Sequence, residues 1–104
     1  MDKNSVTEII SHFKKILETK GIKKSKIILY GSYAKGTQRE ESDIDLVVIS
    51  EDFRGKDFWE RINLLSDSIY EVFAPIEATA FTPEEWEQGN SFIIDYAEEG
   101  EIVA

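Results

Sequence analysis

The sequence predicts an α/β fold built as one domain over residues 1–104. Apolar residues recur at helical spacing in two long segments, 6–17 and 58–72, and three short apolar runs have the length of strands. Helical and strand patterns alternate along the chain, which is typical of the α/β class. Since a domain commonly holds about 100 to 150 residues, we expect a single core. The predicted order is α-β-(short α)-β-α-β-α, with three or so strands and about four helices.

The first helix is predicted from the amphipathic segment near the N-terminus. Ser5 and Glu8 have the spacing of a capping box at its start, and Gly21 is expected to end it. Its apolar positions, which recur every three or four residues, are Val6, Ile9, Ile10, Phe13, Ile16 and Leu17.

Two buried strands are predicted on either side of a polar loop. The first is Lys26–Tyr30, an apolar run that Gly31 closes with a turn. The segment Ser32–Glu41 is small and polar, so we expect a loop with room for one helical turn. The second strand, Ile44–Ser50, is rich in Ile, Val and Leu.

A second long helix and a third strand follow. Residues 58–72 carry apolar side chains at helical spacing, Asp57 and Glu60 form a capping signature, and Pro75 ends the segment. Ile76–Phe81 alternates in the manner of a strand, with Ile and Ala on one side and Glu77 on the other.

The C-terminal part is predicted to be helical. Thr82 and Pro83 begin a helix because proline is tolerated at the first helical position, and Gly89 interrupts it. A last helical piece, Phe92–Glu99, stops at Gly100, and residues 102–103 are expected to dock as a short tail.

Charge and composition exclude several classes of function. The chain has 21 acidic and 12 basic residues, a formal charge of −9, so we expect no direct contact with nucleic acid, whose affinity depends on Lys and Arg. Without cysteine, a metal must be held by oxygen ligands or by His12. Apolar runs reach only four residues, against about 20 for a membrane span, so we expect no membrane association. The N-terminus does not resemble a signal peptide, and we expect a cytoplasmic protein.

Two acidic residues at the start of the second predicted strand form a candidate metal site. Asp43 and Asp45 are two residues apart in a strand, so their side chains lie on one face about 6.5 to 7 Å apart while Ile44 points into the core. Like charges about 4 Å apart repel by roughly 4 kcal/mol at an effective dielectric constant of about 20. A divalent cation between them removes this cost, and oxygen ligands favour Mg²⁺ or Mn²⁺.

A candidate phosphate site precedes these aspartates by ten intervening residues. Gly31 allows a sharp turn and a close approach of the backbone, and Ser32 offers a hydroxyl and an N–H to a phosphate. Lys35 and Arg39 are the nearest cations that could reach a triphosphate. An Asp-x-Asp pair alone is more often a solvated turn, but its spacing from Gly31 and Ser32 favours a nucleotide site.

The segment from Gly31-Ser32 to Asp43-Ile44-Asp45 resembles the signature of the DNA polymerase β-type nucleotidyltransferase superfamily, and the short chain is similar to its minimal branch. The resemblance extends over roughly residues 5–100. It implies a nucleotidyltransferase fold with a mixed sheet flanked by helices. It also implies that Asp43 and Asp45 bind metal, while Gly31 and Ser32 contact the triphosphate.

The resemblance also implies a third carboxylate on the next strand, and Glu77 occupies that position in place of the commoner Asp. The implied reaction is transfer of a nucleoside monophosphate from ATP, or another nucleoside triphosphate, to a hydroxyl group. Two Mg²⁺ ions would clamp the attacking and leaving oxygens, with Asp43 and Asp45 bridging them. Glu77 would bind one ion and help to deprotonate the acceptor.

Minimal members of the superfamily are often paired with a HEPN-type toxin, to which they add AMP. The resemblance therefore implies a protein adenylyltransferase that acts as the antitoxin of a toxin–antitoxin pair. One alternative is a non-catalytic binding module that neutralises its partner by contact, which Glu77 keeps open. Another is an aminoglycoside-type nucleotidyltransferase subunit, since a cationic substrate suits the charge of −9.

Overall fold

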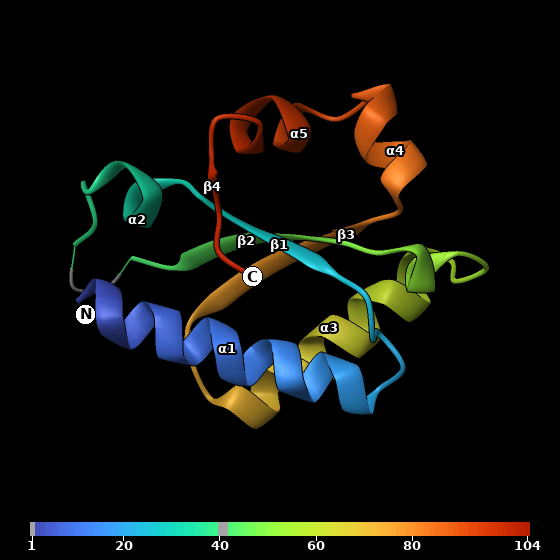
Figure 1. Ribbon diagram of the computed structural model, residues 1–104, viewed down its shortest axis with the longest axis horizontal. Helices are drawn as coiled ribbons and strands as arrows, with labels where there is room; N and C mark the ends of the chain where they lie inside the picture. Colours follow the sequence, from blue (N-terminus) through green and yellow to red (C-terminus); the bar gives the residue numbers. More distant parts are fainter. Residues whose placement is uncertain (1, 40–41) are drawn as a thin grey trace.

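The computed structural model describes residues 2–39 and 42–104 (Figure 1). Four strands form one sheet in the order β3-β2-β1-β4. Helices α1 and α3 lie on one face of this sheet, and α4 and α5 lie on the other side (Figure 1). The predicted α/β class is confirmed. The last two residues of the predicted loop 32–41, residues 40 and 41, lie outside the described residues.

Helix α1, Lys3–Thr19, begins earlier than predicted. Its N-cap is Asp2, whose side-chain Oδ1 accepts a hydrogen bond of 2.8 Å from the backbone N–H of Ser5. The predicted capping box of Ser5 and Glu8 is therefore wrong, because Ser5 lies inside the helix. A carboxylate at the N-cap also stabilises the positive end of the helix dipole.

The three predicted strands are β1, Lys26–Tyr30; β2, Ile44–Ile49; and β3, Ile76–Phe81. Strand β2 runs antiparallel to β1 and parallel to β3, so the sheet is mixed, as the family resemblance implied. Strand β2 ends one residue before the prediction because Ser50 caps a short 3-10 helix, Glu51–Phe53.

Helix α3, Phe58–Val72, has the predicted bounds. The Asp57 side chain accepts a hydrogen bond from the backbone N–H of Glu60, and the Glu60 side chain accepts one from the backbone N–H of Asp57, which completes the predicted capping box. Phe73 ends the helix in the left-handed conformation, with a φ of 57°. Among the described residues, no helix combines the length and the apolar character needed to cross a membrane.

The C-terminal part contains α4, Pro83–Gln88; α5, Phe92–Ala97; and β4, Glu101–Ile102. Gly89 ends α4 in the left-handed conformation, as the predicted interruption requires. Helix α5 ends two residues before the predicted Glu99. The predicted docked tail is partly a strand: β4 pairs antiparallel with β1, with Ile102 opposite Ile28, so the sheet has a fourth strand.

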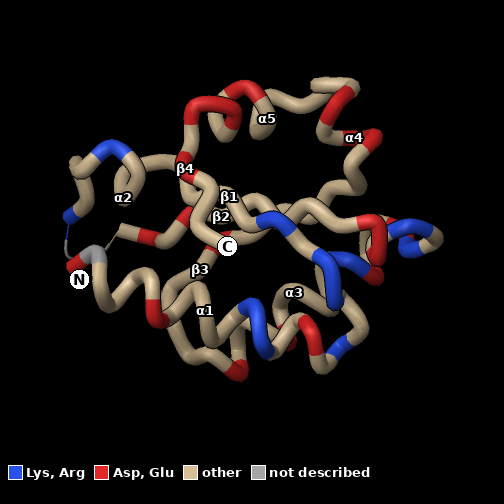
Figure 2. The backbone as a smooth tube through the Cα atoms, in the orientation of Figure 1, with Lys and Arg blue, Asp and Glu red and all other residues tan. Residues whose placement is uncertain are grey.

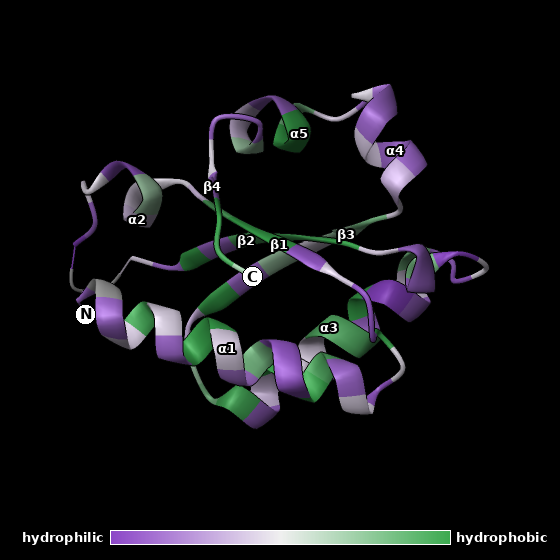
Figure 3. Cartoon of the chain, in the orientation of Figure 1, coloured by the Kyte–Doolittle hydropathy of each residue, from purple (hydrophilic) through white to green (hydrophobic). Residues whose placement is uncertain are grey.

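The main core lies between the sheet and the pair α1 and α3. Every second side chain of each strand points toward α1 and α3, and the apolar side chains of α1 pack against them. Strands β1 and β2 are mostly hydrophobic, whereas α4 is mostly hydrophilic (Figure 3). The residues buried here include Val6, Ile10, Phe13 and Leu17 of α1, Ile27 and Leu29 of β1, Ile44, Leu46 and Val48 of β2, and Leu65 of α3. A smaller apolar cluster on the opposite face joins Ile28, Val47 and Ile49 to Ala97.

Candidate active site

Gly31 lies between β1 and the four-residue helix α2, Ser32–Lys35, and is held in a conformation that favours glycine. Its φ is 76° and its ψ is −151°, a region that residues with a Cβ rarely adopt. A Cβ atom at this position would overlap Oδ2 of Asp45. The missing side chain therefore allows the Asp45 carboxylate to lie directly against the backbone turn that leads into Ser32.

A row of three polar side chains crosses the sheet beside this turn. Tyr30 of β1 is in register with Asp45 of β2, and Asp45 is in register with Glu77 of β3. Because residues in register project to the same face, all three side chains lie together on the face opposite the main core. The parallel pairing of β2 and β3 thus brings together two of the predicted site carboxylates.

The environment of Asp45 raises the pKa of its carboxyl group to about 6. Burial is the main cause, followed by the negative charge of Glu77, a hydrogen bond between the Asp45 and Glu77 side chains, and the charge of Asp43. Burial, together with the charges of Asp45 and Glu77, also raises the pKa of the Tyr30 phenol. The negative charges of Asp45 and Glu77 thus add to burial in raising the pKa of the groups around them.

Asp43 is exposed and lies just outside β2, which begins at Ile44. Residues 2–39 and 42–104 contain no group of three or more His, Cys, Asp or Glu side chains close enough to hold a metal ion. The expected cluster of Asp43, Asp45 and Glu77 is thus not preassembled in the structure. The pairing of β2 with β3 brings Asp45 and Glu77 together, but Asp43 lies outside β2 and is not held beside them. Metal binding by the three residues stays a prediction.

The donor chemistry of the pair formed by Asp45 and Glu77 fits a hard divalent cation. Both groups are carboxylates, whose oxygens Mg²⁺ and Mn²⁺ prefer. Among the described ion pairs, no Lys or Arg side chain neutralises either group. A cation at this position would offset the negative charges of Glu77 and Asp43, which add to the effect of burial on the pKa of Asp45.

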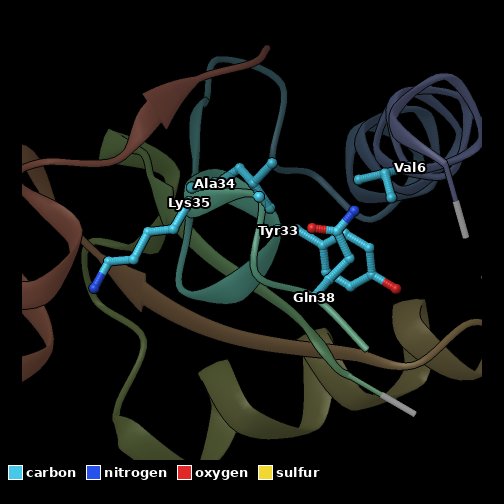
Figure 4. A pocket seen from close by; sticks show the side chains of 7 residues that line it. Val6, Tyr33, Ala34, Lys35 and Gln38 are labelled. Atoms are coloured by element: carbon cyan, nitrogen blue, oxygen red, sulfur yellow. The ribbon is translucent and has the colours of Figure 1, made fainter. Parts of the chain in front are cut away.

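The predicted basic contacts, Lys35 and Arg39, are both exposed. Lys35 extends away from Tyr33 and Gln38 (Figure 4). The backbone N–H of Arg39 donates a 2.8 Å hydrogen bond to Oγ of Ser42. No ion pair of either side chain with a described residue is present, so both are available to an anion, and their contact with a triphosphate stays a prediction.

Two tyrosines near the Gly31 turn were not among the predicted functional residues, and one lies at the site while the other packs in the main core. Tyr30 belongs to the polar row, and alternation along β1 after the core residues Ile27 and Leu29 could have placed it on the same face as Asp45. Tyr33 is buried and lines a cavity of about 250 Å³ with Val6, Lys35 and Gln38 (Figure 4). Within the described part of the chain, its hydroxyl finds no hydrogen-bond partner.

Comparison with known proteins identifies the family. A family model described as the nucleotidyltransferase domain matches residues 10–104. The chain therefore belongs to the nucleotidyltransferase domain family, and the resemblance seen in the sequence from Gly31 to Asp45 is confirmed.

Curated relatives match over part of their length. Two proteins of Methanocaldococcus jannaschii, each named "Putative protein adenylyltransferase", are 44% and 40% identical to the chain over 62 residues. Each match covers 60% of this chain, and the matches cover 61% and 54% of the two relatives. The chain thus spans little more than half the length of these relatives.

Solved structures share the fold. A chain from the crystal structure of a toxin-antitoxin with AMP-PNP superposes with a TM-score of 0.63 over 94% of this chain and 72% of its own length, at 22% identity. The crystal structure of a "putative nucleotidyltransferase" gives a TM-score of 0.56 over 80% of this chain and 88% of its own length, at 27% identity. The predicted nucleotidyltransferase fold is therefore confirmed.

Proposed function

We propose that the chain is a Mg²⁺-dependent nucleotidyltransferase that moves AMP from ATP to a hydroxyl group of a protein partner of HEPN type. One observation carries the proposal: the Asp45 carboxylate lies against the Gly31 turn and is in register with Glu77 of the neighbouring strand. The turn that can cradle phosphate and the carboxylates that can hold a cation thus meet at one end of the sheet.

Each residue of the site has a distinct role in this proposal. The backbone N–H groups at the start of α2, beginning with Ser32, face no helical acceptor and would bind phosphate oxygens. Asp45 and Glu77, joined by Asp43, would hold the cation. Bound Mg²⁺ would stabilise the negative charge that develops on the phosphates during transfer. Glu77, which is exposed, would also accept the proton of the attacking hydroxyl.

The distribution of charge supports a protein acceptor rather than nucleic acid. Residues 62–104 contain ten Asp and Glu residues and no Lys or Arg. Acidic residues follow α4, α5 and β4 along one side of the molecule (Figure 2). Such a surface attracts a basic protein and repels phosphate backbones. The names of the M. jannaschii relatives and the toxin-antitoxin structure support the same class of acceptor.

The first experiment is a calorimetric titration of ATP with Mg²⁺ into the wild type and into the Asp43→Asn, Asp45→Asn double variant. We expect binding by the wild type and a loss of at least about tenfold in affinity for the double variant, since each missing charge weakens the cation site. A Glu18→Gln, Asp67→Asn variant makes the same change in charge at exposed positions of α1 and α3, which cover the opposite face of the sheet, and should bind as the wild type does. Absence of binding by the wild type would overturn the proposal.

A second candidate function is neutralisation of the partner by contact alone. The specific observation in its favour is that, among the described residues, Asp43 does not join Asp45 and Glu77 in a preformed metal cluster. If the double variant still neutralises a HEPN-type partner in cells as well as the wild type does, contact is sufficient. Loss of neutralisation by a folded double variant favours the enzyme.

A further inference from the structure

An open groove runs beside the outer edge of β3, on the side away from β2. It has a volume of about 740 Å³, and its floor is formed by residues 78–81 of the strand. Ile62 and Leu65 of α3 line one wall, and Ile93 and Ile94 of α5 line the other. Glu77 is the next residue of the same strand beyond this floor, so the groove leads to the candidate active site.

Within residues 2–39 and 42–104, backbone groups on the outer edge of β3 have no hydrogen-bond partner, and they face this groove. The backbone carbonyls of Pro75 and Phe81 accept hydrogen bonds from Ile44 and Ser50, so the odd-numbered residues of this segment face β2. Backbone groups alternate along a strand, and the N–H and C=O groups of Ala78 and Ala80 therefore point away from β2. Buried backbone groups without a partner are costly, and an exposed strand edge is a template for a further strand.

We propose that the acceptor segment of the protein substrate binds in this groove as an extended strand paired with β3. This inference rests on the proposed function and adds how that substrate is recognised. Main-chain hydrogen bonds to Ala78 and Ala80 would supply affinity, and apolar side chains facing Ile62 and Leu65 would supply selectivity.

The register of such a strand places a hydroxyl at the candidate site. Side chains opposite each other on paired strands lie on the same face, with Cβ atoms about 4.5 to 5.5 Å apart. The acceptor residue opposite Glu77 therefore projects beside the Glu77 carboxylate, on the face that carries Asp45. Glu77 lies on the edge strand, and its side chain is one methylene longer than that of Asp, which helps it to reach a residue on an added strand.

ATP is the donor in the chemical step. The acceptor hydroxyl oxygen forms a bond to the α-phosphorus, and the bond from that phosphorus to the α,β-bridging oxygen breaks. Pyrophosphate leaves with that oxygen and its electron pair. The hydroxyl proton passes to the Glu77 carboxylate.

The shape of the groove favours a single strand over a second copy of this chain. The edge of β3 lies between walls that belong to α3 and α5. Two copies facing each other through these edges would bring wall against wall before the strands came within the spacing of about 4.8 Å that pairing needs. A single extended segment carries no helices beside it, so it can enter the groove and reach the edge of β3.

Three ten-residue peptides test the proposal. They carry Ser, Thr or Tyr at the centre, Val at alternate positions and Lys at both ends, and are otherwise identical. With Mg²⁺ and radiolabelled ATP, we expect at least one peptide to accept AMP. By NMR, we expect the same peptide to slow hydrogen exchange at the Ala78 and Ala80 amides, with little change at Glu77 and Thr79.

The variants Ala80→Pro and Ile102→Pro form a matched pair. Each removes an N–H that points away from the sheet, the first in the groove and the second on the opposite edge strand, β4, where Val103 rather than Ile102 bonds to β1. Proline is tolerated at such edge positions. We expect AMP transfer to fall at least tenfold in Ala80→Pro and to stay within twofold in Ile102→Pro.

The outcomes separate this inference from the proposed function. Equal transfer by both proline variants, or no amide protection by any peptide while ATP and Mg²⁺ bind normally, would overturn strand pairing at β3. If the wild type does not bind ATP but a peptide still protects the Ala78 and Ala80 amides, the enzymatic function would instead be overturned, and the groove would remain a peptide-binding site.

Discussion

The two faces of the sheet differ in how they are covered and in what they carry. On one face, the long helices α1 and α3 bury an apolar layer that includes Phe13 and Leu17, both with 0% exposure. On the other face, the cover is provided by α4 and α5, of six residues each, and one end of the sheet carries Asp45 and Glu77. The first face thus provides most of the stability, while the second leaves room for a ligand.

This difference shows that different faces of one small sheet can carry the residues that stabilise the fold and the residues of the candidate site. Buried apolar area is the main favourable term in folding, and most of it lies under α1 and α3. The clustered carboxylates on the opposite face oppose folding when they are ionised, as the raised pKa of Asp45 indicates. Substitutions in the main core should therefore change mainly the free energy of unfolding, whereas substitutions at the site should also change ligand binding.

The largest effect on stability is expected from Phe13→Ala. Removing a fully buried aromatic ring between α1 and the sheet should reduce the free energy of unfolding by about 3 to 5 kcal/mol. The matched control is Phe92→Ala in α5, where the ring is 71% exposed and the change should stay within about 0.5 kcal/mol. Urea denaturation followed by circular dichroism measures both. Similar losses in the two variants would show that the faces do not differ as described.

A smaller effect is expected from Gly31→Ala at the site. The new Cβ would overlap the Asp45 carboxylate in a backbone region that favours glycine, at a cost of about 2 to 3 kcal/mol in the free energy of unfolding. Gly89→Ala is the control, because Gly89 also has a positive φ, of 66°, but has open space around it; its cost should be about 1 kcal/mol.

The same pair of variants tests the link to the ligand. Gly31→Ala should weaken binding of ATP with Mg²⁺ in calorimetry because Asp45 must move, whereas Gly89→Ala should bind as the wild type does. Equal costs in unfolding and unchanged nucleotide binding in both variants would contradict the proposed contact between the turn and Asp45.

The smallest expected effect is the dependence of stability on pH without metal. The pKa of Asp45 is raised in the folded state, from 3.8 to about 6. Its stabilising contribution is therefore fully present below about pH 3.8 and is lost as the pH rises through about 6. Asp45→Asn, which is neutral throughout, should unfold at a slightly higher temperature than the wild type at pH 7.5 in the presence of EDTA, and the difference should shrink toward pH 5.

Thermal unfolding followed by calorimetry measures this difference, and added Mg²⁺ supplies the complementary test. Mg²⁺ should raise the unfolding temperature of the wild type at pH 7.5 more than that of Asp45→Asn, since a ligand of the folded state stabilises it. A constant difference between the two proteins from pH 5 to pH 7.5 would show that Asp45 does not titrate in this range.

The helices and strands that carry the main core could be predicted because their patterns are local. The helical repeat of 58–72, the capping residues Asp57 and Glu60 and the apolar run 26–30 are each readable within a short window. The N-terminus of α1 was predicted at the wrong residue because Ser5 and Asp2 both have the chemistry of a helix cap, and only the observed hydrogen bond selects Asp2.

The sequence by itself determined the class of fold, the glycine that the turn at Gly31 needs and the Asp-x-Asp pair that follows at the family spacing. The tertiary structure alone decided that Tyr30, Asp45 and Glu77 share one row and that Ile102 joins the sheet as part of β4. It also decided that the edge of β3 lies open beside the site. The physical reason is that strand register and edge exposure depend on packing between segments far apart in the chain, which no local pattern records.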